Sequence, residues 1–178
     1  MIKTVINLIH LDKTNELPKV KDLYFEAFPK YERVPFWLLM YRSKKKNCNL
    51  YTIYDGNEYI GFLYLTYYKD IVYVFYFAIE PAQQSKGYGS IVLQHLKEIY
   101  QDKRLLLNIE KVDRAADNYE QRFKRKQFYK KNGFLNTNFE IEDKNIVYEI
   151  LYSGEDVYEF EYHALFKAYY GRILSLIF

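Results

Sequence analysis

The sequence predicts an α/β protein of the α+β type, in which helices flank one mixed and mostly antiparallel central sheet. Residues 71–79, IVYVFYFAI, carry no charge and are rich in β-branched and aromatic side chains, which is typical of a strand buried on both faces. A helical period follows directly, with apolar side chains at Tyr88, Val92, Leu96 and Ile99. Strand-like runs then alternate with further helical patterns, so strands and helices share one domain.

Length and composition exclude several classes of protein. At 178 residues the chain is long enough for one domain with a substantial core, and a net charge of +3 is too small to indicate nucleic-acid binding. Cys48 is the only cysteine, so neither a disulfide framework nor a cysteine-based metal site is expected. No apolar run has the length of a signal peptide or membrane span, and a cytoplasmic protein without membrane contact is expected.

The first half of the chain reads as strand, two helices and a meander. Asp55-Gly56 is favourable hairpin-turn chemistry, and Gly61 inside a strand indicates a bulge or close packing. The helix near residue 17 has Thr14 or Asn15 as a capping candidate. The expected elements are strand 4–9, helix 17–28, a short helix after Pro35, and strands 50–54, 59–68 and 71–79.

The second half begins with the helix at 88–99, which carries the chain to a strand at 104–109. Two strands joined by such a helical crossover are expected to be parallel neighbours. Gly133 has the features of a left-handed residue that ends the next helix. The expected elements are helix 119–132, a closing hairpin of 134–138 with 145–151, helix 158–170 and strand 173–178.

The loop Gln84-Ser85-Lys86-Gly87-Tyr88-Gly89 joins the central strand to its helix. Unpaired N–H groups at a helix start, beside a lysine and two glycines, are suited to phosphate, although an ordinary turn has the same composition. The Walker and dinucleotide patterns both fail, because Tyr88 follows Gly87 and position 92 is valine. The RNA-recognition RNP1 pattern fails too, since Ser90 and a helical period follow Gly89.

The loop resembles the acetyl-CoA loop of the GNAT superfamily of N-acetyltransferases, Gln/Arg-x-x-Gly-x-Gly/Ala, with a preceding apolar strand and Pro81. A second resemblance is Phe128-Tyr129-Lys130-Lys131-Asn132-Gly133-Phe134, which is similar to the family's Phe/Leu-Tyr-x-x-x-Gly-Phe pattern. The resemblance covers residues 1–151 and implies the GNAT fold, with its sheet splayed at the middle. Residues 152–178 would be a helix and strand extension packed on the same domain.

The resemblance implies roles for individual residues. Tyr129 would protonate the leaving thiolate, and the N–H group of Ile79 would polarise the thioester. Arg122 stands where many members have asparagine, and it either contacts CoA phosphates or lies on a solvated basic face with Arg125 and Lys126. The residues expected to contact the cofactor are Phe77, Ala78, Ile79, Gln84, Ser85, Lys86, Gly87, Tyr88, Gly89, Ser90, Arg122 and Tyr129.

The general base and the acceptor site have several candidates. Glu80 and Glu110 are both candidates for the base, because each follows a strand, where burial can raise a carboxyl pKa. Glu110 is slightly preferred because its strand is expected to be buried, whereas Glu80 lies close to the cofactor loop and could be a solvated charge. Glu149 and ordered water remain alternatives. The acceptor wall would contain residues of the first two helices and their connection, and Glu32 would suit a cationic amine. The residues expected there are Phe28, Tyr31, Glu32 and Trp37.

The function implied by the resemblance is acetyl transfer from acetyl-CoA to a primary amine of a small molecule or peptide, with CoA as product. A catalytically silent acetyl-CoA-binding module on the same fold is the alternative. An aromatic-sheet nucleic-acid binder ranks last, because the charge is modest and a helix follows Gly89. The C-terminal extension would serve either to close a homodimer or to shape the acceptor site.

Overall fold

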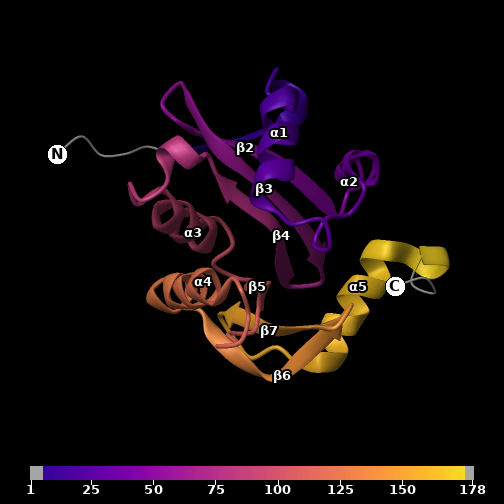
Figure 1. Ribbon diagram of the computed structural model, residues 1–178. Coiled ribbons are helices and arrows are strands. Elements are labelled where there is room, and N and C mark those ends of the chain that lie inside the picture. Colours follow the sequence, from indigo (N-terminus) through magenta and orange to yellow (C-terminus); the bar gives the residue numbers. More distant parts are fainter. Residues whose placement is uncertain (1–5, 175–178) are drawn as a thin grey trace. The chain divides into compact units, whose positions relative to one another are not determined.

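The computed structural model describes the backbone of residues 6–174 and the side chains of residues 6–171 (Figure 1). Among the helices of this part of the chain, none is both long and apolar enough to cross a membrane. The elements run β1 (Ile6–His10), α1 (Leu17–Ala27), α2 (Phe36–Ser43), β2 (Cys48–Asp55), β3 (Glu58–Tyr68), β4 (Ile71–Ile79), α3 (Tyr88–Ile99), β5 (Arg104–Glu110), α4 (Tyr119–Lys131), β6 (Leu135–Asp143), β7 (Ile146–Ser153) and α5 (Glu159–Leu174).

The strands hydrogen-bond in the order β1-β2-β3-β4-β5-β7-β6. β1 pairs with β2, β2 with β3, β5 with β7 and β6 with β7, all antiparallel. β4 and β5 form the expected parallel ladder, which comprises three pairs from Ile71↔Arg104 to Tyr73↔Leu106. The predicted fold class, a mixed and mostly antiparallel sheet flanked by helices, is confirmed.

The chain folds into two compact units, one formed by Met1–Thr66 with Val74–Ile99 and the other by Tyr67–Tyr73 with Tyr100–Phe178. The core of the first unit lies around β3, in which every residue from Tyr59 to Thr66 is buried. Each of the three helices of this unit contributes apolar side chains at helical spacing to the core. The buried helical residues are Val20, Leu23 and Tyr24 of α1, Leu38 and Leu39 of α2, and Val92, Leu93 and Leu96 of α3.

A bulge interrupts the pairing of β2 with β3. Ile53 pairs with Gly61 and Tyr54 with Tyr59, so Ile60 is an extra residue on β3. The carbonyl of Ile60 accepts a hydrogen bond of 2.9 Å from the N–H of Glu80, immediately beyond β4. A Cβ on Gly61 would lie 2.2 Å from the carbonyl oxygen of Ala78. Both expectations for Gly61, a bulge and close packing, are therefore confirmed.

Two buried tyrosines hold the connection between α1 and α2. The hydroxyl of Tyr24 donates to the carbonyl of Val34 at 2.7 Å, and that of Tyr76 donates to the carbonyl of Glu32 at 2.8 Å. The Tyr76 oxygen also accepts from the N–H of Val34 at 3.0 Å. Because these partners are backbone groups, the connection is held to β4 whatever side chains it carries.

In the second unit, α5 packs on the sheet through Tyr162, Leu165 and Tyr169, all buried. Arg104, at the start of β5, forms ion pairs with Glu161 in the first turn of α5 and with Asp70 in the turn between β3 and β4, each at 2.7 Å. Its guanidinium also donates to the carbonyl of Asp156 at 2.8 Å. The hydrogen bonds from Arg104 lower the pKa values of Asp70 and Glu161.

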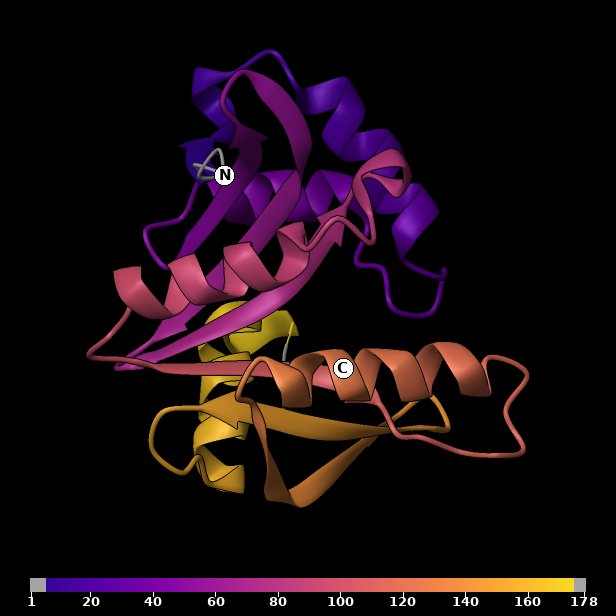
Figure 2. The same cartoon turned by 90° about the vertical axis from the view of Figure 1, so that its left-hand side faces the viewer.

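Charge, rather than apolar packing, holds α4 to its sheet. No residue of α4 is fully buried, although Phe128 and Tyr129 are half-buried, and in both views the helix lies along β5 and β7 (Figures 1 and 2). Lys126 reaches Glu149 of β7 at 2.6 Å, while Arg122 and Arg125 reach Glu110 of β5 at 3.0 and 3.4 Å. The two carboxylates are 2 % and 5 % exposed. Removing one partner of an ion pair that is this well enclosed strongly destabilises a protein.

Several boundaries differ from expectation. β6 and β7 are longer than predicted, because Lys144 and Asn145 adopt φ values of 51° and 64° and form a two-residue turn without glycine. Neither capping candidate caps α1, since Thr14 donates instead to the carbonyl of Leu11. Gly171, with φ 75° and ψ 172°, interrupts α5 where the predicted helix 158–170 ends, but residues 173 and 174, expected in a strand, are helical beyond this kink; residues 175–178 lie outside the described part of the chain.

We expect Gly61→Ala to lower the free energy of unfolding by about 3 kcal/mol, because a methyl group cannot lie 2.2 Å from a backbone oxygen. Chemical denaturation measures this. The control is Gly56→Ala, at a hairpin glycine with a φ of 59° and open space around its Cβ position, which should cost about 1 kcal/mol. Equal losses in the two variants would show that the contact of Gly61 with Ala78 carries no strain.

We expect Arg104→Leu to destabilise the protein by about 2 kcal/mol at pH 7, between the values for exposed and buried ion pairs. Because Asp70 and Glu161 have lowered pKa values, their contribution is complete above their ordinary pKa values near 4 and is lost as the pH falls further. Denaturation at pH 7 and pH 3 should show the difference between wild type and variant shrinking. Arg104→Lys should lose less, and an undiminished difference at pH 3 would contradict an ionic origin.

Candidate functional site

The loop between β4 and α3 has an irregular backbone that few sequences adopt. Ser85 has a φ of 63° and Gly87 a φ of 88°, both in the left-handed region that favours glycine. The short 3₁₀ helix Pro81–Gln83 precedes them, and the Gln84 amide donates to the carbonyl of Ile79 at 3.0 Å. These contacts bring the chain from the end of β4 to the first turn of α3 within the first unit.

The start of α3 leaves several donors unused. The carbonyl of Gly87 accepts from the N–H groups of Ser90 and Ile91 at 3.1 and 3.2 Å. In the described part of the chain, the N–H groups of Gly87, Tyr88 and Gly89 have no acceptor. Nothing lies within 4 Å of the Cβ position of Gly87. A cluster of free donors at the positive end of a helix, open on one side, fits a phosphate or pyrophosphate group.

The side chains of the loop are tied to one another and to the β2–β3 hairpin. Lys86 donates to the side-chain oxygen of Gln83 at 2.8 Å, and the Gln83 amide donates to the Glu58 carboxylate. The Tyr88 hydroxyl donates to Asp55 at 2.8 Å, which raises the pKa of the tyrosine. The exposed ammonium of Lys86 thus lies within the loop that leaves the three N–H groups free.

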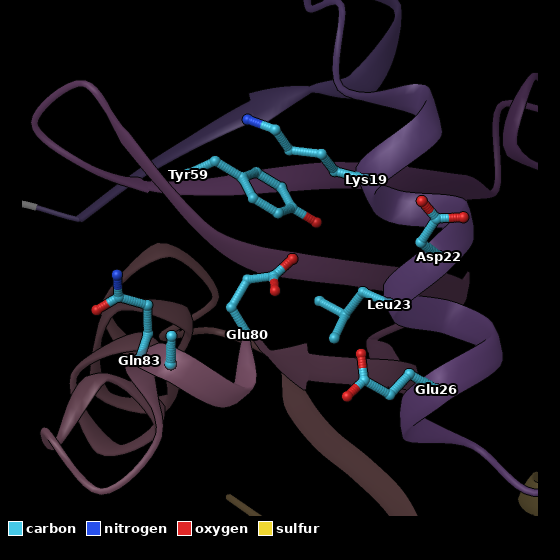
Figure 3. A pocket seen from close by; sticks show the side chains of 8 residues that line it. Lys19, Asp22, Leu23, Glu26, Tyr59, Glu80 and Gln83 are labelled. Atoms are coloured by element: carbon cyan, nitrogen blue, oxygen red, sulfur yellow. The ribbon is translucent and has the colours of Figure 1, made fainter.

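An open pocket of about 400 Å³ lies between α1 and the end of β4 (Figure 3). Glu80 points into it, and so does the hydroxyl of Tyr59, which the bulge in β3 places opposite (Figure 3). Burial raises the pKa of Glu80, and the neighbouring carboxylates of Glu26 and Asp22 raise it further, against the effect of Lys19. The remaining lining residues are Leu23, Ala82 and Gln83.

Tyr129 lies in the last turn of α4, in the second unit. Its ring packs edge-on against Phe128 and Phe134, with centroids 5.1 and 5.6 Å apart. Gly133, with a φ of 75°, ends the helix, and the N–H of Phe134 returns to the carbonyl of Tyr129 at 3.1 Å. Burial of the phenol raises the pKa of Tyr129 to about 12. Its hydroxyl has no hydrogen-bond partner among the described residues.

The other expected catalytic and phosphate-binding side chains of the second unit are engaged with one another. Glu110 accepts from Asn118 at 3.1 Å as well as from the two arginines. Arg122 uses all three nitrogens, donating to Asn118 at 2.7 Å, to the carbonyl of Lys111 at 3.0 Å and to Glu110. Glu149 accepts from Asn136 at 2.9 Å in addition to Lys126.

The expected acceptor residues lie on and beside the connection from α1 to α2, in the first unit. Phe28 is half-buried and packs on Tyr76, with ring centroids 4.8 Å apart. The side chain of Tyr31 is 39 % exposed and that of Trp37 71 % exposed, so neither belongs to the core. Glu32 is half-buried, and its backbone carbonyl is the one that Tyr76 holds.

The same unit contains site residues that sequence reasoning missed. Asp22, Glu26 and Tyr59 line the pocket into which Glu80 points, but only Glu80 was singled out. The sequence does contain one indication of this pocket. Asp22 and Glu26 are four residues apart on α1, so they lie on one face of the helix without a cation between them. The position of Tyr59 follows from the bulge, whose exact register the sequence does not show.

The model of the Acetyltransferase (GNAT) family matches residues 17–134. A protein from Bacteroides thetaiotaomicron that is described as an acetyltransferase of the GNAT family by its title alone has a similar structure, with a TM-score of 0.73, 22 % identity, and coverage of 90 % of this chain and 92 % of that one. An aminoglycoside 6'-N-acetyltransferase complexed with coenzyme A matches with a TM-score of 0.65, 13 % identity, and coverage of 84 % and 96 %.

The ribosomal-protein-S18-alanine N-acetyltransferase from Escherichia coli matches with a TM-score of 0.59, 17 % identity, and coverage of 86 % and 99 %. No protein of curated function matches the chain in sequence. At these identities the structural matches show the fold, and the family model, which spans more than half of the chain, shows the family. The protein therefore belongs to the Acetyltransferase (GNAT) family, as its two motifs indicated, and its acyl donor is the acetyl-CoA of that family.

Proposed function

We propose that this protein transfers an acetyl group from acetyl-CoA to a primary amine of a small molecule or peptide. The observation that carries the proposal is the group of three unpaired N–H donors at Gly87, Tyr88 and Gly89, on a loop that also matches the family's motif. These donors would hold the pyrophosphate of the cofactor, with Lys86 beside them and Ser85 and Ser90 flanking. Acetyl-CoA supplies the activated thioester, and the remaining chemistry is binding and proton transfer by this chain.

The strand end of β4 would bind the linear part of the cofactor. Phe77, Ala78 and Ile79 would offer backbone groups as an additional strand would, and the N–H of Ile79 would polarise the thioester carbonyl. The Gln84 side chain occupies the carbonyl of Ile79 and so fixes the end of this segment. The tight contact of Gly61 with Ala78 holds the same segment from the other side.

Glu80 is the better candidate for the general base. Its carboxylate points into an open pocket and has a raised pKa, which increases its affinity for the amine proton. Glu110 and Glu149 are instead enclosed by cationic side chains of α4, which fill their hydrogen-bonding positions. We therefore assign these two carboxylates, together with Arg122, to holding α4 on its sheet.

Tyr129 would supply the proton that the leaving thiolate requires. Because desolvation raises its pKa to about 12, the hydroxyl of Tyr129 carries its proton at neutral pH. Among the described residues that hydroxyl donates to no other group, so the proton is available for transfer. Parts of the acceptor beyond its reacting amine would lie along Phe28, Tyr31, Glu32 and Trp37, on the connection that Tyr24 and Tyr76 hold.

We expect acetyl-CoA at about 100 times its Kd to add about 2.7 kcal/mol of stability and to raise the Tm by roughly 5–11 °C. Differential scanning fluorimetry measures this. Gly87→Glu should abolish the shift, because it places a carboxylate against the phosphates and a side chain at a φ of 88°. Gly171→Glu introduces the same charge at a glycine with a φ of 75° in α5, and should keep the shift. No shift in wild type at millimolar acetyl-CoA would overturn the proposal.

We expect kcat, followed as thiol release, to fall as the pH drops through the raised pKa of Glu80, because the protonated carboxyl cannot accept a proton. Glu80→Gln should lose this dependence and about 100-fold in kcat. Tyr129→Phe should lower kcat by about 10- to 100-fold while the Tm shift with acetyl-CoA is kept.

The matched control is Glu110→Gln, which should lower the Tm through its lost ion pairs but keep the acid limb of the pH profile. Loss of that limb in Glu110→Gln and its retention in Glu80→Gln would reverse the assignment of the base. A protein that binds acetyl-CoA but releases no thiol with any amine would be a silent binding module rather than an enzyme.

A further inference from the structure

The pocket beside Glu80 contains uncompensated negative charge. Asp22 and Glu26 are exposed on one face of α1, and neither forms an ion pair with any described residue. Like charges four residues apart destabilise a helix. Glu80 adds a third carboxylate to the lining of the same pocket; burial raises its pKa, and the charges of Glu26 and Asp22 raise it further. The fold thus keeps an unfavourable arrangement that a bound cation would relieve.

Lys19 is the cation at the pocket, and it does not neutralise this charge. Its ammonium lies 3.0 Å from the carboxylate of Glu16 and 5.3 Å from the centroid of the Tyr59 ring. One lysine shared with a fourth carboxylate leaves the pocket with a net negative charge. Figure 3 shows the Lys19 ammonium directed away from Asp22 and Glu26.

Tyr59 gives an independent sign of a ligand. Its side chain is 8 % exposed, and its buried hydroxyl has no hydrogen-bond partner in the described part of the chain. Figure 3 shows that hydroxyl directed into the space bounded by Glu80 and α1. Burying an unpaired hydroxyl is unfavourable, and native proteins keep such groups mainly where a ligand or water completes them.

The chemistry of the lining selects an organic cation. No group of three acidic, histidine or cysteine side chains in the described residues has an arrangement that could hold a metal ion. An ammonium donates up to three hydrogen bonds, which suits carboxylates and a tyrosine oxygen that lack partners. Leu23 and Ala82 provide short apolar walls for methylene groups.

We propose that the acetyl acceptor is an aliphatic diamine or polyamine. Asp22, Glu26 and the Tyr59 hydroxyl bind one ammonium of the acceptor, and Glu80 serves the amine that reacts. This inference rests on the proposed N-acetyltransferase activity, whose acceptor it narrows to amines that carry a second positive charge separated by methylene groups.

Binding and turnover test the two proposals separately. Isothermal calorimetry with spermidine, with and without saturating acetyl-CoA, reports on the pocket, and n-butylamine is the probe with a single charge. Wild type should bind spermidine at least about tenfold more tightly than n-butylamine. The double variant Asp22→Asn/Glu26→Gln should lose that preference, and its KM for spermidine should rise while its KM for n-butylamine stays the same.

The matched control is Asp12→Asn, which removes one exposed carboxylate of the first unit outside the pocket and should leave spermidine binding unchanged. Tyr59→Phe provides a readout that a merely structural tyrosine would not give. The variant should raise the Tm of the unliganded protein, because an unpaired buried hydroxyl is removed, and should weaken spermidine binding.

The protein could bind acetyl-CoA and acetylate spermidine and n-butylamine equally well, and the double variant could leave both activities unchanged. That result would overturn the inference and leave the acetyltransferase proposal intact. Failure of acetyl-CoA to bind or react, with spermidine still bound through Asp22 and Glu26, would overturn the acetyltransferase proposal and the acceptor role. If Asp12→Asn weakens spermidine binding as much as the double variant does, spermidine is attracted only by surface charge, and the inference is overturned.

Discussion

The contact between Gly61 and the carbonyl of Ala78 is the constraint on which the first unit depends. It brings the backbones of β3 and β4 closer than any side chain would permit, and the bulge at Ile60 accommodates it. The hydrogen bond from Glu80 to Ile60 then sets where β4 ends and where the loop to α3 begins. Tyr59, Glu80 and the glycine loop thus take their positions from one close approach of two strands.

The second unit is organised by charge. Arg104 joins the start of β5 to the turn between β3 and β4 and to α5, and a separate set of basic side chains holds α4 to the buried carboxylates of β5 and β7. A helix without a buried apolar face can be retained in this way because each carboxylate has cationic partners within hydrogen-bonding distance. The same arrangement leaves Tyr129, on the last turn of that helix, held mainly by Phe128 and Phe134.

The sequence correctly predicted the helices and strands that have a clear local pattern of apolar residues. β4 and α3 begin and end where the apolar run and the helical period predict, and the parallel pairing of β4 with β5 followed from the crossover. The β6–β7 hairpin was predicted too short, because a turn made by Lys144 and Asn145 has no glycine to mark it. Local propensity describes most of the fold, whereas unusual backbone angles on ordinary residues are set by tertiary contacts.

The sequence singles out candidate site residues most clearly where a motif contains them. The loop at Gly87 and Gly89 and the tyrosine at 129 stand in patterns with fixed spacing, so sequence alone singled them out. The role of Glu110 as a base stays a prediction; its ion pairs with Arg122 and Arg125 could not be predicted, because they come from a helix whose contacts the sequence does not specify. The acidic pocket depends on a bulge and on the rotation of α1, which are properties of packing.

The unpaired donors at the start of α3 belong to the main chain, and this has a consequence for how the protein can change over time. Exchange of Ser85, Lys86 or Tyr88 for any amino acid except proline alters the surroundings of these N–H groups but does not delete them. Anion binding is disturbed directly by residues that cannot adopt the local backbone angles, above all by replacements of Gly87. Anion binding here should therefore tolerate extensive genetic drift, while the acidic pocket, built from side chains, is free to diverge and to acquire new acceptors.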